Sequence, residues 1–364
     1  MTCPPEDAVD AQRRAAIVGL GLIGGSIGLG LRRLGWYVTG DDRDAVRAAR
    51  AQELGAVDAV GTDSEAEVTF VATPVGAVAA AAREALERGP GVVTDVGGVK
   101  ASVVAAVQDP RFIGGHPMAG SEREGVEGAD PDLFTGAAWV LTPIPTTAPD
   151  AFALVHSTVS ALGADVVAVD PERHDAIVAV VSHVPHLTSA ALMGVAARNA
   201  EDQQGPLLRL AAGGFRDMTR ISAGPPGIWP DVCADNAEAI ITVLDELMDE
   251  LTRVRSVVAG RQRADLVAIL ERARVARLGL PAGGARRTAE VVEVRVPVSN
   301  RPGAIAEVSV LASELGVNLE ALETADATEY ERGLIVMVIA AAAADRFRDA
   351  LAAKGYHPVV QAVG

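Results

Sequence analysis

The sequence predicts three structural units in series: a mainly parallel α/β sheet, a helical domain and a small βαββαβ unit. The first unit is indicated by a regular alternation. Residues 14 to about 169 contain short Val-, Ile- and Ala-rich runs, such as "AAIVG", "VTFVATP" and "GVVTDV", separated by mostly Ala-rich segments of helix length. This alternation is typical of βαβ units, in which helices connect parallel strands.

The other two units follow from changes in this pattern. From Pro171 to about Leu278 the strand signal disappears, and stretches such as "NAEAIITVLDELMDELTRVRSVV" have the spacing of an amphipathic helix. The next segment, "GLPAGGARRTAE", is rich in Gly and Pro and is predicted to be a linker. The remaining residues follow the order βαββαβ, which predicts a ferredoxin-like unit. The expected domains are 1–170, 171–278 and 291–364, with the linker at 279–290.

Composition argues against several kinds of partner. The formal net charge of −16 disfavours binding to nucleic acid or to an anionic membrane surface. The longest apolar run, "AIVAVVSHVPHLTSAALMGVAA", contains two histidines and a proline, so we expect a buried helical region and no membrane span. The first residues include early acids and no apolar core, so no signal peptide is expected. Cys3 and Cys233 form no metal-ligand spacing and suggest no disulfide framework, which makes the cytoplasm the expected location.

Glycines after the first predicted strand form a dinucleotide-binding motif. In "IVGLGLIGGS", Gly19, Gly21 and Gly24 have the G-x-G-x-x-G spacing between a strand and a helix. They allow a tight turn, a close approach of the backbone to a pyrophosphate and close packing of the helix, whose N-terminus faces the phosphates. Asp42, 18 residues after Gly24, ends the next strand and would bind ribose hydroxyls and repel a 2′-phosphate. The motif therefore favours NAD, and the neighbouring Arg43 leaves NADP open.

The stretch "HPMAGSEREGVEG" presents a candidate catalytic histidine, His116, on what the pattern predicts to be a loop. It follows the predicted strand "RFIGG", and ligands of open α/β sheets collect at the carboxyl ends of the strands. Neutral histidine accepts protons near pH 7, and a dehydrogenase that removes hydride from a carbinol carbon needs a base on the hydroxyl group. A structural or solvated histidine is the alternative.

Polar residues of the helical domain offer anion-binding groups. His174, His183 and His186 have no Cys or carboxylate partner at a zinc-like spacing, and Pro185 disturbs the helix, so no metal is predicted. They are either donors for an anionic ligand or satisfied core histidines. Arg220, in "GGFRDMTRIS", could clamp a carboxylate through two hydrogen bonds or form a surface salt bridge.

Taken in order, "GLGLIGGS", "HPMAGSE", "SHVPH" and "FRDMTRI" with "IWPDV" resemble the prephenate/arogenate dehydrogenase family of tyrosine biosynthesis. The resemblance implies a Rossmann domain, an all-α dimerisation domain and a homodimer. It also implies oxidative decarboxylation of a cyclohexadienol with NAD or NADP. We expect prephenate as the substrate, with arogenate as the alternative.

The resemblance assigns roles residue by residue. His116 is the expected catalytic proton acceptor for the C4 hydroxyl as hydride leaves C4, before the ring loses CO2. The hypothesis requires His116 and Arg220 to reach opposite ends of one small diacid. Many relatives carry serine where this chain has Gly98. The expected substrate-binding residues are Arg220, His186, His183, His174, Glu122 and Trp229, and the expected cofactor-binding residues are Gly19, Gly21, Leu22, Ile23, Gly24, Asp42, Arg43, Thr73, Pro74 and Gly98.

The C-terminal residues resemble an ACT domain, and "VSNRPGAIAEV" fits its first loop. The resemblance implies an amino-acid effector, tyrosine or phenylalanine, bound near Asn300 and Gly303.

Two other readings of the whole chain remain. A β-hydroxyacid dehydrogenase would usually rely on a lysine in the helical domain, and residues 171–278 contain none. A non-catalytic regulatory protein that senses nucleotides and amino acids would not need both His116 and Arg220.

Overall fold

The computed structural model describes residues 12–121, 123–202, 211–224, 226–280, 291–299, 304–317, 319, 321–326 and 332–362. The chain divides into two compact units, Met1–Glu271 and Arg272–Gly364.

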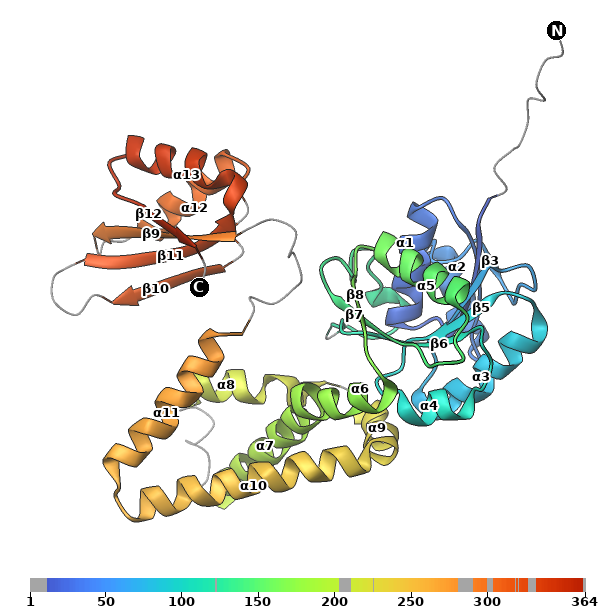
Figure 1. Ribbon diagram of the computed structural model, residues 1–364, viewed down its shortest axis with the longest axis horizontal. Helices are drawn as coiled ribbons and strands as arrows, with labels where there is room; N and C mark the ends of the chain where they lie inside the picture. The colour runs from blue at the N-terminus through green and yellow to red at the C-terminus, as the bar shows by residue number, and fades with distance from the viewer. Residues whose placement is uncertain are drawn as a thin grey trace, which may run out of the picture. The chain divides into compact units, whose positions relative to one another are not determined.

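An eight-stranded sheet forms the first part of the larger unit (Figure 1). Its order is β3-β2-β1-β4-β5-β6-β7-β8, and every pair is parallel except β6 with β7. The mainly parallel sheet is therefore confirmed, whereas the antiparallel pair and the two-residue β3 were not predicted. The strands are β1 (Arg14–Val18), β2 (Tyr37–Asp41), β3 (Ala59–Val60), β4 (Val68–Val71), β5 (Val92–Asp95), β6 (Phe112–Pro117), β7 (Ala138–Thr142) and β8 (Asp165–Ala168).

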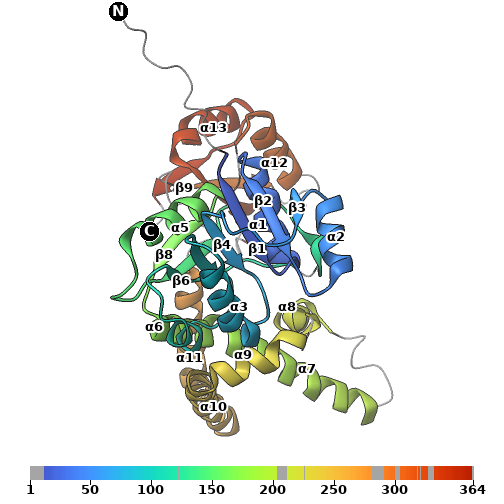
Figure 2. The ribbon, with the colours of Figure 1, turned by 90° about the vertical axis from the view of Figure 1, so that its right-hand side faces the viewer.

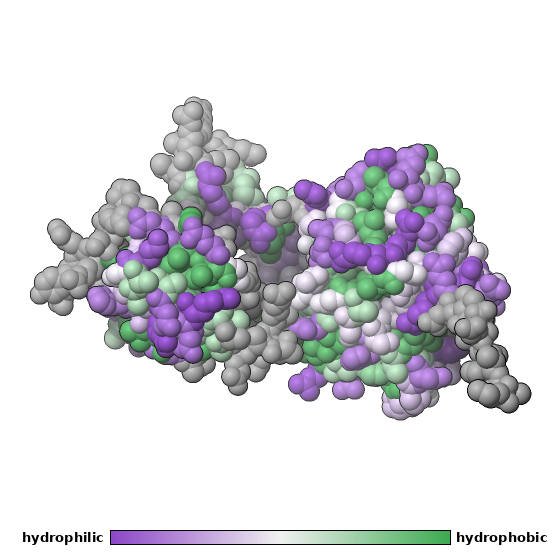
Figure 3. Space-filling view, turned by 90° about the horizontal axis from the view of Figure 1, so that it is seen from above, coloured by the Kyte–Doolittle hydropathy of each residue, from purple (hydrophilic) through white to green (hydrophobic). Residues whose placement is uncertain are grey.

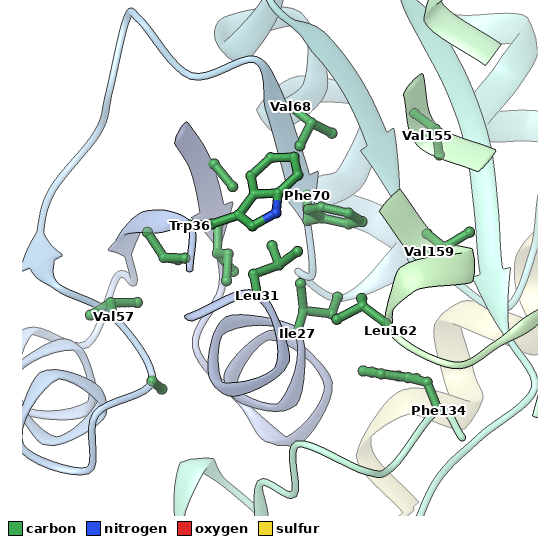
Figure 4. Packing of buried hydrophobic residues seen from close by; sticks show 14 of the residues in the cluster. Ile27, Leu31, Trp36, Val57, Val68, Phe70, Phe134, Val155, Val159 and Leu162 are labelled. Atoms are coloured by element: carbon green, nitrogen blue, oxygen red, sulfur yellow. The ribbon is translucent and has the colours of Figure 1, made fainter. Parts of the chain in front are cut away.

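Helices cover both faces of this sheet. Alternate residues of a strand point to opposite faces, and β4 shows this directly. Phe70 packs in one core with residues of α1, α2 and α5, and Val71 in another with residues of α3 and α4. Figure 4 shows the first core, where Leu31 lies between Trp36 and Ile27 close to Phe70. The helices are α1 (Leu22–Arg33), α2 (Ala45–Glu53), α3 (Val75–Arg88), α4 (Ala101–Ala106) and α5 (Pro149–Ala161).

The strand order reverses between β1 and β4, because the chain proceeds from β1 to β2 on one side and returns to β4 on the other. Loops at such a switch point diverge, and open α/β sheets bind ligands in the crevice between them. The glycine motif follows β1, and Thr73 and Pro74 follow β4, so both lie at this edge. The face of the α/β part seen in Figure 3 mixes hydrophilic and hydrophobic residues.

The second part of the larger unit is helical among its described residues, as predicted (Figure 2). A π-helical turn, η2, interrupts the first long helix, and such turns are frequent at functional sites. The elements are α6 (Pro171–Val178), η2 (Ala179–His183), α7 (Val184–Asp202), α8 (Gly213–Thr219), η4 (Arg220–Ala223), η5 (Pro226–Ile228), α9 (Trp229–Asp235), α10 (Ala237–Ala259) and α11 (Arg263–Leu278).

The segment Pro171–Asn199 is long and apolar enough to cross a membrane, with a mean hydropathy of 1.5. It nevertheless carries His174 and Asp175, both buried and both hydrogen-bonded to groups of the α/β part. Only 28% of its most apolar window is buried, and Val180 and Val181 are exposed. Its polar bonds fit a helix that packs against the sheet domain.

The smaller unit has the predicted order of elements, β-α-β-β-α-β. Its sheet has the order β10-β11-β9-β12, and all three pairs are antiparallel. Alternate residues of β9, Val294, Val296 and Val298, are buried against helix residues such as Phe347, and the two helices cover that face of the sheet (Figure 1). The elements are β9 (Val291–Ser299), α12 (Ala304–Glu314), β10 (Ala321–Asp326), β11 (Arg332–Ala340), α13 (Ala341–Ala353) and β12 (Val359–Ala362).

Candidate active site

The glycine loop between β1 and α1 leaves no room for side chains at two of its positions. Gly19 has φ +98°, and a Cβ atom there would lie 2.5 Å from the carbonyl oxygen of Ala72. A Cβ atom at Gly24 would lie 1.9 Å from the carbonyl oxygen of Gly19. At Gly21 a Cβ atom would meet nothing within 4 Å, and this residue caps α1 without a side chain. The loop therefore packs against the end of β4 and leaves open space at the helix N-terminus, where Leu22 and Ile23 begin α1.

Asp42 lies just after β2 and ties this loop to the neighbouring strand. One oxygen of its carboxylate accepts a hydrogen bond from the backbone N–H of Leu20 at 2.8 Å, and Arg47 approaches the other at 3.3 Å. The side chain of Asp42 is 7% exposed, whereas Arg43 is exposed. Asp42 is thus fixed at the end of β2, where the acid of a dinucleotide site is expected.

Thr73 supplies a second sign that this edge of the sheet accepts a ligand. Its hydroxyl oxygen is buried and has no hydrogen-bond partner in the protein. Buried polar atoms rarely stay unpaired, so an unpaired one beside a binding loop calls for a partner from elsewhere. Together with the open space at Gly21, it makes the switch point fit a dinucleotide.

His116 is the fifth residue of β6, so our prediction that it lies on a loop was wrong. The strand continues through Pro117 because β7 pairs with it in antiparallel fashion, with His116 opposite Val140. The sequence pattern hid this, because Gly114 and Gly115 look like the start of a turn. A Cβ atom at Gly115 would lie 2.6 Å from the backbone oxygen of Asp95, so this glycine serves close packing of the two strands.

A hydrogen-bonded chain joins His116 to the helical part. Its Nδ1 atom lies 2.8 Å from Nε2 of His174, and Nδ1 of His174 lies 2.7 Å from Oδ1 of Asp175. The carboxylate of Asp175 also accepts hydrogen bonds from the backbone N–H groups of Lys100 and Ala101, at 2.8 and 2.9 Å. Both ring nitrogens of His174 thus have protein partners, and the ring is 1% exposed. This leaves no nitrogen for the direct substrate contact expected of it.

The other edge of the His116 ring faces Gly98, in the loop after β5. A Cβ atom at Gly98 would lie 3.9 Å from both Nε2 and Cε1 of His116. A serine hydroxyl at this position would therefore reach towards Nε2. With glycine, this space stays open.

His116 is neutral at pH 7. Burial lowers the pKa of His116 well below its ordinary value, and the electrostatic influence of the neighbouring His174, Lys100 and His183 lowers it further. A neutral imidazole with an open Nε2 can accept a proton.

Lys100 and Asp95 form a buried ion pair under this histidine, which our sequence analysis missed. Both are 0% exposed, and Nζ of Lys100 bonds Oδ2 of Asp95. The carboxylate of Asp95 also accepts hydrogen bonds from the backbone N–H groups of Gly97 and Gly115, at 2.8 and 3.1 Å. Burial lowers the pKa of Lys100, and the charge of Asp95 opposes that shift. The available signal was the position of Asp95 at the carboxyl end of a predicted strand.

His183, His186 and Trp229 come together, as expected. The rings of His186 and Trp229 stack at 3.7 Å with an interplanar angle of 15°, and His183 meets the Trp229 ring edge-on at 6.1 Å. Nδ1 of His183 lies 3.1 Å from Nδ2 of Asn236, a residue that the sequence analysis did not single out. Burial lowers the pKa values of His183 and His186, and for His183 Asp175 opposes the shift.

Arg220 begins η4, is exposed and lies in an element that contacts α7, the helix that carries His186. Its expected reach to the substrate opposite His116 stays a prediction. The expected residues Glu122, Asn300 and Gly303 lie outside the described residues. Among the described residues, no group of three His, Cys, Asp or Glu side chains could hold a metal ion.

Comparison with known proteins gives the family. The model of the prephenate dehydrogenase nucleotide-binding domain matches residues 27–168, and that of the prephenate dehydrogenase dimerization domain matches residues 170–272. A prephenate dehydrogenase of Bacillus subtilis (strain 168) is 30% identical over 334 residues, which cover 88% of this chain and 90% of that protein. The chain belongs to the prephenate dehydrogenase family.

Solved structures of similar proteins support the same assignment. Arogenate dehydrogenase of Synechocystis is 31% identical, with a TM-score of 0.63, over 72% of this chain and 98% of that one. Prephenate dehydrogenase from A. aeolicus, in complex with hydroxyphenyl propionate and NAD+, is 28% identical, with a TM-score of 0.69, over 74% and 98%. This member of the prephenate dehydrogenase family is therefore an oxidoreductase with a Rossmann-like domain, and the resemblance of its first two domains to that family is confirmed.

Proposed function

We propose that the protein is an NAD-dependent prephenate dehydrogenase, which converts prephenate into 4-hydroxyphenylpyruvate and CO2. The observation that carries the proposal is the neutral, half-buried His116, whose Nε2 edge borders the open space at Gly98. It fits a base that accepts the C4 hydroxyl proton of the substrate.

NAD is the cofactor that the residues fit. The amides of Leu22 and Ile23 at the N-terminus of α1 would hold its pyrophosphate, and Asp42 would accept the ribose hydroxyls. Arg43 and Arg47 near Asp42 keep NADP as a second possibility. When bound, NAD would supply the acceptor for the hydride. Thr73, Pro74 and Gly98 would line the rest of the cofactor site.

The helical part would bind the two carboxylates of prephenate. Arg220 is the group for one carboxylate, because its planar guanidinium can form two parallel hydrogen bonds. His183 and His186 would add donors, and Trp229 would border the ring. Glu122 is retained as a further pocket residue. His116 only has to hold the proton that it takes from the C4 hydroxyl. It need not assist the loss of CO2, because aromatisation of the ring drives that step.

Arogenate is the second candidate substrate, because the arogenate dehydrogenase of Synechocystis is as similar to this chain as the prephenate dehydrogenases are. The two substrates differ only in a keto or an amino group on the side chain. Cofactor reduction with each substrate, in NAD and in NADP, measures both preferences in one experiment. No reduction with either substrate, in a protein that is folded by its melting curve, would contradict the proposed function.

The active form is proposed to be a homodimer built on the helical part. Apolar residues lie exposed along α10 at spacings that share one face: Ile241, Met248, Leu251 and Val258. Exposed apolar surface of this kind marks a protein interface. Light scattering after size exclusion should give twice the monomer mass of 37.4 kDa. A monomeric but active protein would contradict this part of the proposal.

The smaller unit is proposed to be an ACT domain of ferredoxin-like fold that binds an amino-acid effector, tyrosine or phenylalanine. Its order of elements and its antiparallel sheet support this. The match to the Bacillus subtilis enzyme covers 88% of the chain, more than residues 1–271 provide, so it extends into this unit. An enzyme lacking residues 291–364 should lose any feedback response. We also propose a cytoplasmic location, in keeping with the free thiol of Cys233.

A further inference from the structure

We propose that Asp175 is a positioning residue that sets the proton positions on two active-site histidines, leaving Nε2 of His116 as an acceptor and Nε2 of His183 as a donor. The inference rests on the proposed function for its catalytic meaning, but the proton positions follow from hydrogen bonds alone.

The first step is the direction of the bond between Asp175 and His174. Backbone N–H groups can only donate, and the two from Lys100 and Ala101 each point at a different oxygen of the Asp175 carboxylate. A carboxylate without a proton is an acceptor only. Nδ1 of His174, 2.7 Å from Oδ1, must therefore carry a proton and donate it.

The direction of this bond determines the direction of the next one, between His174 and His116. A neutral imidazole has one N–H donor and one acceptor nitrogen. Because Nδ1 of His174 donates, its Nε2 is the acceptor, and Nδ1 of His116 at 2.8 Å must be the donor. Nε2 of His116 is then left without a proton, on the ring edge that faces Gly98. This is the tautomer that can accept a hydroxyl proton.

The third step gives His183 the opposite arrangement. Nδ2 of Asn236 donates to the backbone carbonyl of Asp175 at 2.9 Å, which identifies that atom as the amide nitrogen. Its second hydrogen points to Nδ1 of His183 at 3.1 Å, so Nδ1 accepts. Nε2 of His183 then bears the proton and can donate to an anionic substrate group. The side chain of Asp175 thus orients one histidine and its carbonyl, through Asn236, orients the other.

Asp175 also fixes where these histidines lie. Asp175 belongs to α6, whereas the two backbone N–H groups that donate to its carboxylate, those of Lys100 and Ala101, lie at the start of α4. The pair His116–His174 is faced by Lys100 from the α/β part and by Asp175 and His183 from the helical part. Asp95 pairs with Lys100, and Asp235 lies near Asp175. Activity should be lost in acid by titration of His116 itself, because a protonated ring can no longer accept the hydroxyl proton.

The decisive measurement is nitrogen NMR of the full-length protein labelled with ¹⁵N-histidine, since the chemical shifts of the two ring nitrogens distinguish the tautomers. The chain has only six histidines, and single His→Gln variants assign them. At pH 7.5 we expect His116 as the Nδ1–H form and His183 as the Nε2–H form. His116 in the Nε2–H form would overturn the proposal. This readout needs no substrate, so it stands or falls separately from the prephenate reaction.

Kinetics of matched variants test the consequence. Both carboxylate oxygens of Asp175 accept hydrogen bonds, so the NH2 group of Asp175→Asn must face at least one N–H donor. This variant should lower kcat about 100-fold or more, with little change in KM for NAD. His174→Gln keeps one donor and one acceptor and should retain at least roughly tenfold more activity than His174→Leu. The control is Asp170→Asn, at the residue that precedes the same helix, where the carboxylate is exposed and makes no capping bond.

Each kinetic outcome bears on the proposal. Wild-type kcat and pH profile in Asp175→Asn would overturn it, as would equal activity in His174→Gln and His174→Leu. If Asp175 had a purely structural role, His174→Gln and His174→Leu would lose the same amount of activity. The activity that remains in these variants would then have the pH profile of wild type. If Asp175→Asn does not fold, the proposal is tested by the tautomers that NMR gives for the native protein and by the kinetics of the two His174 variants.

Discussion

Nδ1 of His116 on strand β6 lies 2.8 Å from Nε2 of His174 on helix α6. Together with the bonds from Lys100 and Ala101 to Asp175, this bond joins the nucleotide-binding part of the enzyme to its helical part, at the residue where the chemistry is expected. It also places the His174 ring where it lowers the pKa of His116.

Replacing His116 with asparagine should lower kcat by about 100-fold or more, because loss of a general base typically costs 10²–10⁴ in rate. NAD affinity, measured by fluorescence titration, should change little, because His116 lies on β6 and the glycine loop on the far side of β4 and β5. Unchanged turnover in this variant would remove His116 from its proposed role.

Activity should persist below pH 6.5, because burial holds the pKa of His116 well below that ordinary value. The base is neutral above its folded-state pKa, so kcat/KM should be level there and fall as the pH drops through it. If kcat/KM of wild type instead fell around pH 6.5 or above, burial would not be lowering the pKa of the base.

The same shift should weaken the fold in acid. The unfolded chain takes up a proton at His116 as the pH falls below 6.5, whereas the folded chain does not until a lower pH. The free energy of unfolding therefore falls with falling pH in that window. In His116→Asn the slope of stability against pH should be smaller, and equal slopes in the two proteins would count against the depressed pKa.

Alanine substitutions at two glycines of the same loop should have different effects. At Gly24 the new Cβ would lie 1.9 Å from the carbonyl oxygen of Gly19, so Gly24→Ala should lower the melting temperature and NAD affinity together. At Gly21 the Cβ meets nothing within 4 Å, so Gly21→Ala should fold normally and raise KM for NAD only. Normal NAD binding in Gly21→Ala would show that no phosphate approaches there.

Gly98→Ser should be tolerated, because its Cβ would make ordinary contacts of 3.9 Å with His116. A serine hydroxyl that donates to Nε2 stabilises the neutral ring, so the acid limb of kcat/KM should move to lower pH. The pH profile of the variant measured beside wild type checks this, and a shift in the opposite direction would mean that the hydroxyl does not reach Nε2.

Arg220→Ala should raise KM for the substrate roughly 30-fold or more. Arg220 is exposed in the free enzyme, and a bound carboxylate would exclude water from the pair, whose truncation then costs about 2 kcal/mol or more. Arg216→Ala is the matched control, since its guanidinium bonds the backbone oxygen of Ala211 on the surface. If both variants bind the substrate like wild type, another group holds the carboxylate.

The sequence predicted the sheet because its strands are apolar runs separated by helix-length segments, and β4 and β5 are buried throughout. It did not reveal the antiparallel β7, because pairing direction depends on where the chain returns in space. For the same reason His116 was placed on a loop. A strand that ends in "GGHP" has no local signal that a neighbour extends it.

The candidate site was only partly predictable. Gly19, Gly24 and His116 can be recognised in the sequence from their residue types and spacing. Asp175 and Asn236 cannot, because their partners are distant in sequence: Lys100 is 75 residues from Asp175, and His183 is 53 residues from Asn236. His174 was found from its residue type, but its bonds to two other side chains, which decide its function, depend on tertiary packing alone.

The burial of Lys100 has a practical consequence. The sequence contains two lysines, Lys100 and Lys354, and the side chain of Lys100 is fully inaccessible whereas Lys354 is exposed. Of these two lysines, an amine-reactive dye or resin would therefore couple to the intact enzyme at Lys354 and not at Lys100. Lys354 lies in the smaller unit, so a fluorophore there would report on that unit while the lysine beside His116 stays unmodified.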